Sequence, residues 1–403
     1  MLKKITNERL IAILFFLPTI YIYVSKLSLY ISPASVIRII LYPIAYSIGI
    51  IVYFRNIKQK KVLLILLFFL SLLIFNCFFF PQSCRFIFSS STSGGIFLSD
   101  FMIFVFISLP LLFVSYFNND SSIIINEFGK IGKYILILFI ITYGLMMFVY
   151  NDSMDYMNIA YGIVPWLMFC WGYAKKNKKL LDLLLCLSTF LFICVSGCRG
   201  AALTCIIFFI LMYASSFNKK ITLKQILVFI VSILIIIIFL IYLNDIANFV
   251  YEILSKFGFK SRTLELFLGI GYEKGFTHYA DRADVQLPLL SNINFFGYGL
   301  YGDRLLTTNF QYAHNLFLEW LIDFGILMGG LIILLFLYYI IANVKKLFFE
   351  KNYCNKIIIS SCLSILCCKY MLSASYLHMP EFWLMIGLFI GNTKKIKFIF
   401  KNS

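Results

Sequence analysis

Residues 62–80 read VLLILLFFLSLLIFNCFFF, an apolar run without a single charged side chain. As a helix, such a run is long enough to cross the roughly 30 Å hydrocarbon core of a bilayer. Comparable runs recur along almost the whole chain of 403 residues, which is 62% hydrophobic and only 13% charged. Soluble domains carry about 25% charged residues, so the composition predicts an all-α membrane protein. The runs are continuously apolar rather than alternating, which argues against a membrane β-barrel.

The apolar runs predict about twelve transmembrane helices. They cover residues 10–25, 33–54, 62–80, 96–117, 131–150, 156–174, 180–196, 201–217, 225–243, 314–342, 357–373 and 380–392. The first run follows basic residues but lacks a small-residue cleavage site, so we expect a retained helix rather than a signal peptide. The runs divide the chain into a nine-helix region (1–243), one large loop (244–313) and a three-helix region (314–403).

The basic residues set the orientation of these helices. Most of them fall in short segments before the first span and after every second span, at residues 3–9, 55–61, 130–133, 175–179, 219–224, 345–356 and 394–401. By the positive-inside rule these segments are cytoplasmic, together with both termini. The net charge of +17 is then a consequence of topology and of attraction to anionic lipid head groups, and nucleic acid is not expected as a partner. The large loop is therefore predicted to be extracytoplasmic.

Cysteine spacing gives no sign of a metal centre. Most of the 11 cysteines lie inside apolar runs, where Cys behaves as a small buried hydrophobe. The large loop contains none, so no disulfide framework holds it together. Cys84 and Cys198 both fall on the predicted outer side, but pairing needs Cα atoms within about 7 Å, and we do not expect it. Neither CxxC nor HExxH spacing occurs, and no cofactor or metal is predicted.

The clearest candidate site lies where the large loop meets the tenth apolar run. Residues 313–325 read Ala-His-Asn-Leu-Phe-Leu-Glu-Trp-Leu-Ile-Asp-Phe-Gly. Ionisable groups are costly at membrane depth, so His314 at a helix mouth is a functional candidate. Asn315 alone is explained as a helix N-cap. That explanation leaves out Glu319 and Asp323, which are spaced i, i+4 on one face of a hydrophobic helix.

Three arginines on the predicted outer side complete the candidate site. Arg199 lies in the tight connection Ser-Gly-Cys-Arg-Gly-Ala at residues 196–201, where positive charge runs against the orientation rule. Arg262 and Arg282 lie in the large loop and could equally be solvated surface residues. One guanidinium group can bind two phosphate oxygens at once. The three arginines together therefore suit a substrate that carries a pyrophosphate.

Several of these motifs resemble those of the O-antigen polymerase (Wzy-type) and O-antigen ligase superfamily. Gly-Tyr-Gly at 297–299, followed by 313–319 and by Gly325, is similar to the closing motif of that superfamily. Ser-Arg-Thr-Leu at 261–264 and Asp-Arg at 281–282 are similar to its two loop arginine motifs. Residues 196–201 are close to its Ser-Arg-Gly-Ala turn, with Cys198 in the usual place of Ser. The matching motifs lie within residues 185–340. The spacing from Arg282 to Gly297 is shorter than the spacing expected in that superfamily.

The resemblance implies a metal-independent glycosyltransferase with a GT-C-like fold in a bacterial inner membrane. It implies that Arg199 and Arg282, assisted by Arg262, hold the pyrophosphate of a polyprenyl-linked oligosaccharide. His314 would take the proton of the acceptor hydroxyl, supported by Asn315, by Glu319 and by Tyr298 of the Gly-Tyr-Gly motif. The implied partners are this donor, the lipid bilayer, and the flippase and chain-length regulator of the same pathway.

Three functions remain open on the sequence. The first is a polymerase that joins O-antigen or capsular repeat units, and we favour it because such polymerases are many and divergent. The second is a ligase that moves the finished glycan to lipid A-core with the same constellation. The third is a transporter of the lipid-linked unit, for which we would expect charges near the bilayer midplane and paired broken helices.

Overall fold

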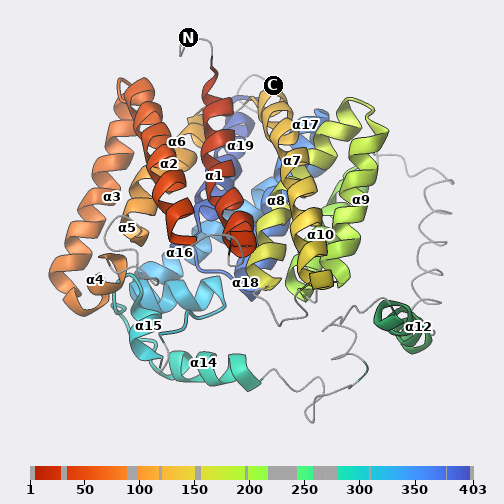
Figure 1. Ribbon diagram of the computed structural model, residues 1–403. Helices are drawn as coiled ribbons and strands as arrows, with labels where there is room; N and C mark the ends of the chain where they lie inside the picture. The colour runs from red at the N-terminus through yellow and green to blue at the C-terminus, as the bar shows by residue number, and fades with distance from the viewer. Residues whose placement is uncertain are drawn as a thin grey trace.

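The computed structural model in Figure 1 describes residues 5–28, 34–88, 99–117, 120–149, 156–195, 198–216, 243–256, 268, 280–307, 310–377 and 379–399. Within these ranges the chain is helical and contains no strand, which confirms the all-α class. The helices of the first half are α1 (Asn7–Ser28), α2 (Ala34–Asn56), α3 (Lys60–Phe79), α4 (Pro81–Phe88), α5 (Asp100–Ile103), the π-helical turn η3 (Phe104–Ser108), α6 (Leu109–Phe117), α7 (Ser121–Val149), α8 (Tyr156–Lys176), α9 (Leu180–Val195) and α10 (Arg199–Ala214).

The second half begins in the large loop and returns to the bundle. Its elements are α12 (Leu243–Lys256), α14 (Ala280–Ser291), α15 (Gly302–Leu306), α16 (Leu316–Phe349), α17 (Tyr353–Ser364), the π-helical turn η4 (Ile365–Lys369), α18 (Tyr370–Leu372) and α19 (Pro380–Ile399).

Five segments among the described residues are long and apolar enough to cross a membrane. They are Asn7–Val24, Lys60–Phe79, Asp100–Phe117, Leu316–Phe349 and Tyr353–Leu372. The chain is therefore a multi-pass helical membrane protein. Helices α2, α7, α8, α9, α10 and α19 coincide with further predicted spans. The predicted span 225–243 lies outside the described residues except for its last residue, Leu243, which begins α12. The count of twelve and the GT-C-like architecture stay predictions.

The apolar segments divide into central and peripheral ones. Within Tyr353–Leu372, 72% of an 18-residue stretch is buried inside the protein, whereas within Lys60–Phe79 the buried share is 17%. Helix α17 is therefore central, and α3 faces lipid. The interior is packed closely where glycines bring helices together. A Cβ atom added to Gly387 of α19 would lie 2.4 Å from the carbonyl oxygen of Leu112 in α6. Side-chain hydrogen bonds also cross the core, since Trp166 Nε1 donates to Thr19 Oγ1 at 3.1 Å.

Helix α16 is broken, which corrects the prediction of one continuous span over 314–342. Gly325 has φ 73° and ψ 177°, well outside helical geometry. Phe336 packs against Trp320, with ring centroids 5.3 Å apart, although sixteen residues of straight helix would separate them by about 24 Å. A Cβ atom added to Gly329 would lie 2.4 Å from the Trp320 carbonyl oxygen. The segment before Gly325 therefore folds back against the segment after it.

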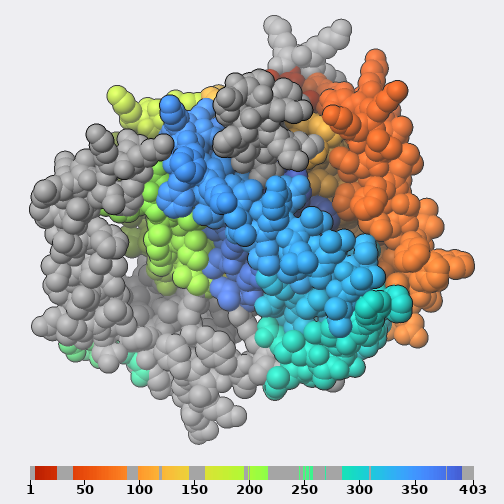
Figure 2. Space-filling view, turned by 180° about the vertical axis from the view of Figure 1, so that it is seen from behind, coloured from red at the N-terminus to blue at the C-terminus, as the bar shows by residue number. Residues whose placement is uncertain are grey.

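The two ends of the bundle differ in what they carry. Helix α1 begins and α19 ends at the same end, the upper one in Figure 1. Helices α4, α14 and α15 lie at the opposite end, where α5, α8, α10 and α19 begin. From behind, the teal surface of α14 and α15 lies beneath α16 and beside the orange surface of α3 and α4 (Figure 2). The candidate site residues that the structure describes belong to this second end.

Candidate functional site

The Gly-Tyr-Gly motif pairs with the break in α16. The amides of residues 298–299 donate to the carbonyl oxygens of residues 322–323, at 2.9 and 3.0 Å. In return, the Ile326 amide donates to the Asn294 carbonyl oxygen at 3.0 Å. A break in a helix leaves backbone amide and carbonyl groups without their partners in the helix, and such groups are costly when they are buried without other partners. Gly297 has φ 81°, and a Cβ atom there would lie 2.4 Å from the Asp323 carbonyl oxygen, so the pairing requires glycine.

Glu319 and Asp323 point from this half-helix into the protein. Each is 2% exposed. Asp323 accepts hydrogen bonds from the Gly302 amide at 2.9 Å and from the Tyr376 hydroxyl at 2.8 Å. Glu319 accepts from the Ser375 hydroxyl and from the Tyr376 amide. The two carboxylates share one face, as their spacing predicted, and they fasten α15 and the turn before α19 to the half-helix.

A second set of contacts connects α15 to the start of α5 and to residue 313. The Asp303 carboxylate accepts hydrogen bonds from the amides of Ala313 and Arg304, both at 2.8 Å. Burial raises the pKa of Asp303, and the Arg304 charge and these amides oppose the rise. Arg304 forms a 3.7 Å ion pair with Asp100, and its guanidinium lies 4.1 Å from the ring centroid of Tyr301. The loop residues before His314 are thereby anchored to the bundle.

His314 lies at the point where the loop enters α16. Its backbone has φ 54°, a left-handed conformation in which His is more common than most residues. On its N-terminal side, the Ala313 carbonyl oxygen accepts a hydrogen bond from Gln286 of α14 at 3.2 Å. The Tyr312 ring lies 4.0 Å from the imidazole, centroid to centroid, and its hydroxyl donates to the Ser373 carbonyl oxygen at 2.7 Å. The residues before His314 are therefore fixed to α14 and to the end of α18, and the imidazole packs against the Tyr312 ring.

The other two supporting residues have structural explanations. Asn315 is the N-cap of α16, and its side chain accepts from the amides of Phe317 and Leu318 at 3.0 and 3.1 Å. Tyr298 packs against a small apolar cluster that joins α14 to the half-helix. That cluster consists of Val285, Leu289, Ala313, Leu318 and Ile322.

The three predicted arginines are placed less completely. Arg199 is the first residue of α10, and Arg282 lies in α14. The side chains of both lie outside what the structure describes, as does the whole of Arg262. The structure brings α14 to His314 through Gln286, and it starts α10 at the same end of the bundle. It leaves the guanidinium groups unassigned.

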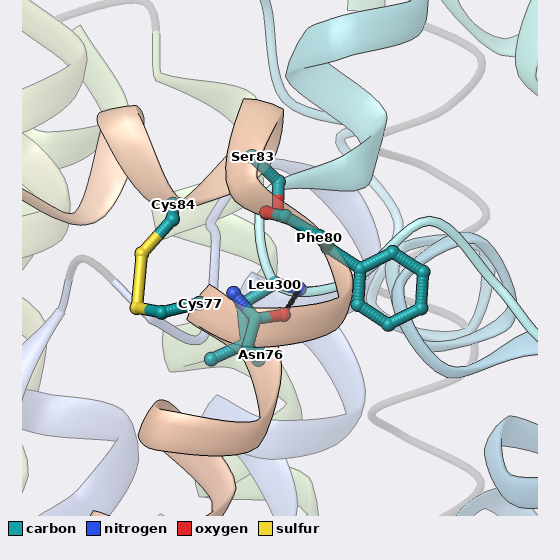
Figure 3. Close-up of a disulfide and its surroundings, with 6 residues drawn as sticks. All are labelled: Asn76, Cys77, Phe80, Ser83, Cys84 and Leu300. Carbon is teal, nitrogen blue, oxygen red and sulfur yellow. Dashed lines mark hydrogen bonds between the residues drawn. A yellow bond between two sulfur atoms is a disulfide. The ribbon is translucent and has the colours of Figure 1, made fainter.

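A disulfide fastens the first half of the chain at this end (Figure 3). Cys77 of α3 pairs with Cys84 of α4, with Cα atoms 5.2 Å apart. The partner of Cys84 is therefore Cys77, which the sequence analysis did not foresee, and Cys198 is buried elsewhere. Beside the disulfide, the Asn76 side chain accepts a hydrogen bond from the Leu300 amide at 2.7 Å. The α3–α4 turn therefore holds the residue that follows the Gly-Tyr-Gly motif.

Sequence reasoning missed Asp303, Arg304, Asp100 and Tyr376. A signal existed for the first two, because a charged pair four residues after Gly-Tyr-Gly is unusual in so apolar a chain. Asp100 opens an apolar run on the predicted outer side, which also marks it. Tyr376 had no signal, since it is one of 26 tyrosines.

Among the described residues, no group of three or more His, Cys, Asp or Glu side chains could hold a metal ion. Neither a family model, nor a curated protein, nor a solved structure matches this chain.

Proposed function

We propose that this chain is a membrane glycosyltransferase that polymerises polyprenyl-pyrophosphate-linked repeat units of an O-antigen or capsule. The observation that carries the proposal is the placement of His314. It is the residue at which α14, α15 and α16 converge, and its backbone is fixed by contacts on its N-terminal side and by an N-cap on the other. A base that must meet an acceptor hydroxyl needs this kind of preorganisation.

The chemistry needs few groups. The acceptor hydroxyl oxygen forms a bond to the anomeric carbon of the donor, the bond from that carbon to the pyrophosphate oxygen breaks, and polyprenyl pyrophosphate leaves. His314 accepts the hydroxyl proton, a role that imidazole side chains often take in enzymes. Arg199, Arg282 and Arg262 neutralise charge on the leaving group. Glu319 takes no part in proton transfer, because it is 2% exposed and bonded to Ser375.

Two features support an extracytoplasmic site. Helices α14 and α15 lie at the end opposite the start of α1 and the end of α19, which the basic residues predict to be cytoplasmic. The Cys77–Cys84 disulfide lies on the same side as α15, and disulfides persist in oxidising compartments. A lipid-linked glycan exported to the periplasm would be reached from this end, in a bacterial inner membrane.

An O-antigen ligase remains the alternative within the same chemistry. It would use the same histidine and arginines with lipid A-core as the acceptor. A transporter of the lipid-linked unit is the second candidate, because two observations favour it. Helix α16 is broken at Gly325, and Lys369 and Glu381 form a buried ion pair in the bundle. Transport leaves the number of sugars per lipid unchanged, which separates it from both transferases.

The test uses the purified protein in lipid vesicles, supplied with a lipid-linked repeat unit from its host and with lipid A-core as a second acceptor. The proposal expects longer glycans and free polyprenyl pyrophosphate as products. For His314→Ala it expects the rate of glycan extension to fall by a factor of about 10²–10⁴, because a positioned base is lost. His278→Ala and His378→Ala are the controls, since neither histidine is followed by Asn and a carboxylate. Glycan transferred only to lipid A-core identifies the ligase. Unchanged lipid-linked units that cross a vesicle membrane identify the transporter and overturn the proposal.

A further inference from the structure

Lys369 and Glu381 form an ion pair inside the bundle that the proposed chemistry leaves without a role. Lys369 is 2% exposed and Glu381 is 5% exposed. The second Glu381 oxygen, Oε1, is buried without a hydrogen-bond partner among the described residues. Removing two charges from water costs several kcal/mol per ion, so an apolar pair of similar volume would be no less stable. An arrangement of this kind calls for an explanation other than stability.

The Lys369 ammonium also contacts Tyr161 of α8. It donates to the Tyr161 carbonyl oxygen at 3.3 Å and lies 5.4 Å from the centroid of the Tyr161 ring. Lys369 ends the π-helical turn η4, and such turns shift the register of the residues that follow them. Both the backbone and the ring of Tyr161 are therefore in contact with the ion pair.

Tyr161 in turn lies against the first turn of α10. A Cβ atom added to Gly200 would be 1.7 Å from the Tyr161 hydroxyl oxygen and 2.9 Å from its Cζ atom. The hydroxyl thus occupies the space that any larger residue at 200 would need. Gly200 follows Arg199 directly, and Cys198 before it is 4% exposed. The chain of contacts runs from Glu381 through Lys369 and Tyr161 to the start of α10.

We infer that the buried Lys369–Glu381 pair is a positioning element that sets the first turn of α10 through Tyr161. Under the proposed function, on which this part of the inference rests, the turn carries Arg199 and presents it to the donor pyrophosphate. An ion pair suits this task, because its geometry is directional whereas apolar packing tolerates sliding. Lys369 and Glu381 touch no substrate and act only through Tyr161.

The first experiment reads the turn directly, without activity. Cys198 is labelled with N-ethylmaleimide in the intact protein in detergent micelles, and peptide mass spectrometry compares it with Cys362 of α17, which is fully buried. Glu381→Gln and Gly200→Ala should raise Cys198 labelling about tenfold, since both favour local opening of the turn, while Cys362 stays protected. Gly330→Ala is the control, because a Cβ atom there meets nothing within 4 Å. Unchanged Cys198 labelling in Glu381→Gln overturns the inference.

The second experiment separates positioning from stability. The double variant Lys369→Met, Glu381→Met removes both charges together, so it should fold about as well as the wild type. The inference expects raised Cys198 labelling and an increase of about tenfold in KM for the lipid-linked donor. A double variant with protected Cys198 and wild-type KM makes the pair a packing feature and overturns the inference. Raised labelling with unaltered glycan synthesis upholds the contact chain and instead overturns the role of Arg199 in the proposed function.

Discussion

The two parts of α16 on either side of Gly325 are both rich in apolar residues but have opposite surroundings. Before the break, Leu316, Leu318, Glu319, Trp320, Ile322 and Asp323 are all buried. After it, Ile326, Leu327, Met328, Leu331, Leu334 and Leu335 are about half exposed or more. The first part contacts the loop and the residues before α19, whereas the second presents a broad apolar face to lipid.

This contrast shows what separates a membrane anchor from a site support. An apolar face needs only length and hydrophobicity, because lipid accepts any apolar side chain. The half-helix before Gly325 instead has carboxylates whose partners are fixed one by one, such as Gly302 and Tyr376 for Asp323. Substitutions in the first part should therefore be costly and specific, and those in the second part mild.

The largest effect is expected from Gly325→Ala. At φ 73° an alanine is strained by about 1–3 kcal/mol, and its Cβ atom would lie 2.3 Å from the Phe295 carbonyl oxygen. We expect a loss of about 3 kcal/mol or more in the free energy of unfolding, measured in detergent micelles, and loss of glycan extension. Gly330→Ala is matched to it, because residue 330 is helical and open, and it should be neutral or stabilising by up to about 1 kcal/mol. Equal losses in the two variants would mean that the break is not required.

A smaller effect is expected from Asp323→Ala. The substitution leaves the Gly302 amide and the Tyr376 hydroxyl buried without their acceptor, at about 1–3 kcal/mol each before relaxation. We expect the free energy of unfolding to fall by about 3 kcal/mol, and by less in Asp323→Asn, which keeps one carbonyl oxygen. Leu331→Ala, at a position 49% exposed, should change it by less than about 0.5 kcal/mol. A Leu331→Ala variant as unstable as Asp323→Ala would contradict the division of α16 into two environments.

The sequence predicted the apolar helices better than their shape. Residues 62–80 are apolar throughout, and α3 spans Lys60–Phe79, because length and hydrophobicity alone identify a spanning helix. The same rule did not predict the break at Gly325, since glycine within an apolar run is common in membrane helices. What breaks α16 is the pairing with residues 297–299, a contact between parts of the chain that no local pattern contains.

The candidate site divides in the same way. The i, i+4 spacing correctly placed Glu319 and Asp323 on one face, and Asn315 is the N-cap that its residue type suggested. The partners of these residues were not predictable, since Tyr376 and Ser375 come from a turn more than fifty residues away. The role of His314 stays a prediction.

The smallest expected effect is a change in the pH dependence of stability on replacing Asp303 by Asn. Burial raises the pKa of Asp303 above its value of about 3.9 in an unfolded chain, so the folded state disfavours the ionised carboxyl. The stability that this group contributes is complete below about pH 3.9 and is lost as the pH rises through the folded pKa. Asn does not titrate, and its carbonyl oxygen still accepts a hydrogen bond from the Ala313 amide, which keeps the chain before His314 in place. The Tm of Asp303→Asn, measured in micelles from pH 4 to pH 8, should therefore improve relative to the wild type as the pH rises. A relative Tm that falls with pH would mean that Arg304 and the two amides outweigh burial, and that the anchor of residue 313 is an ionised carboxylate.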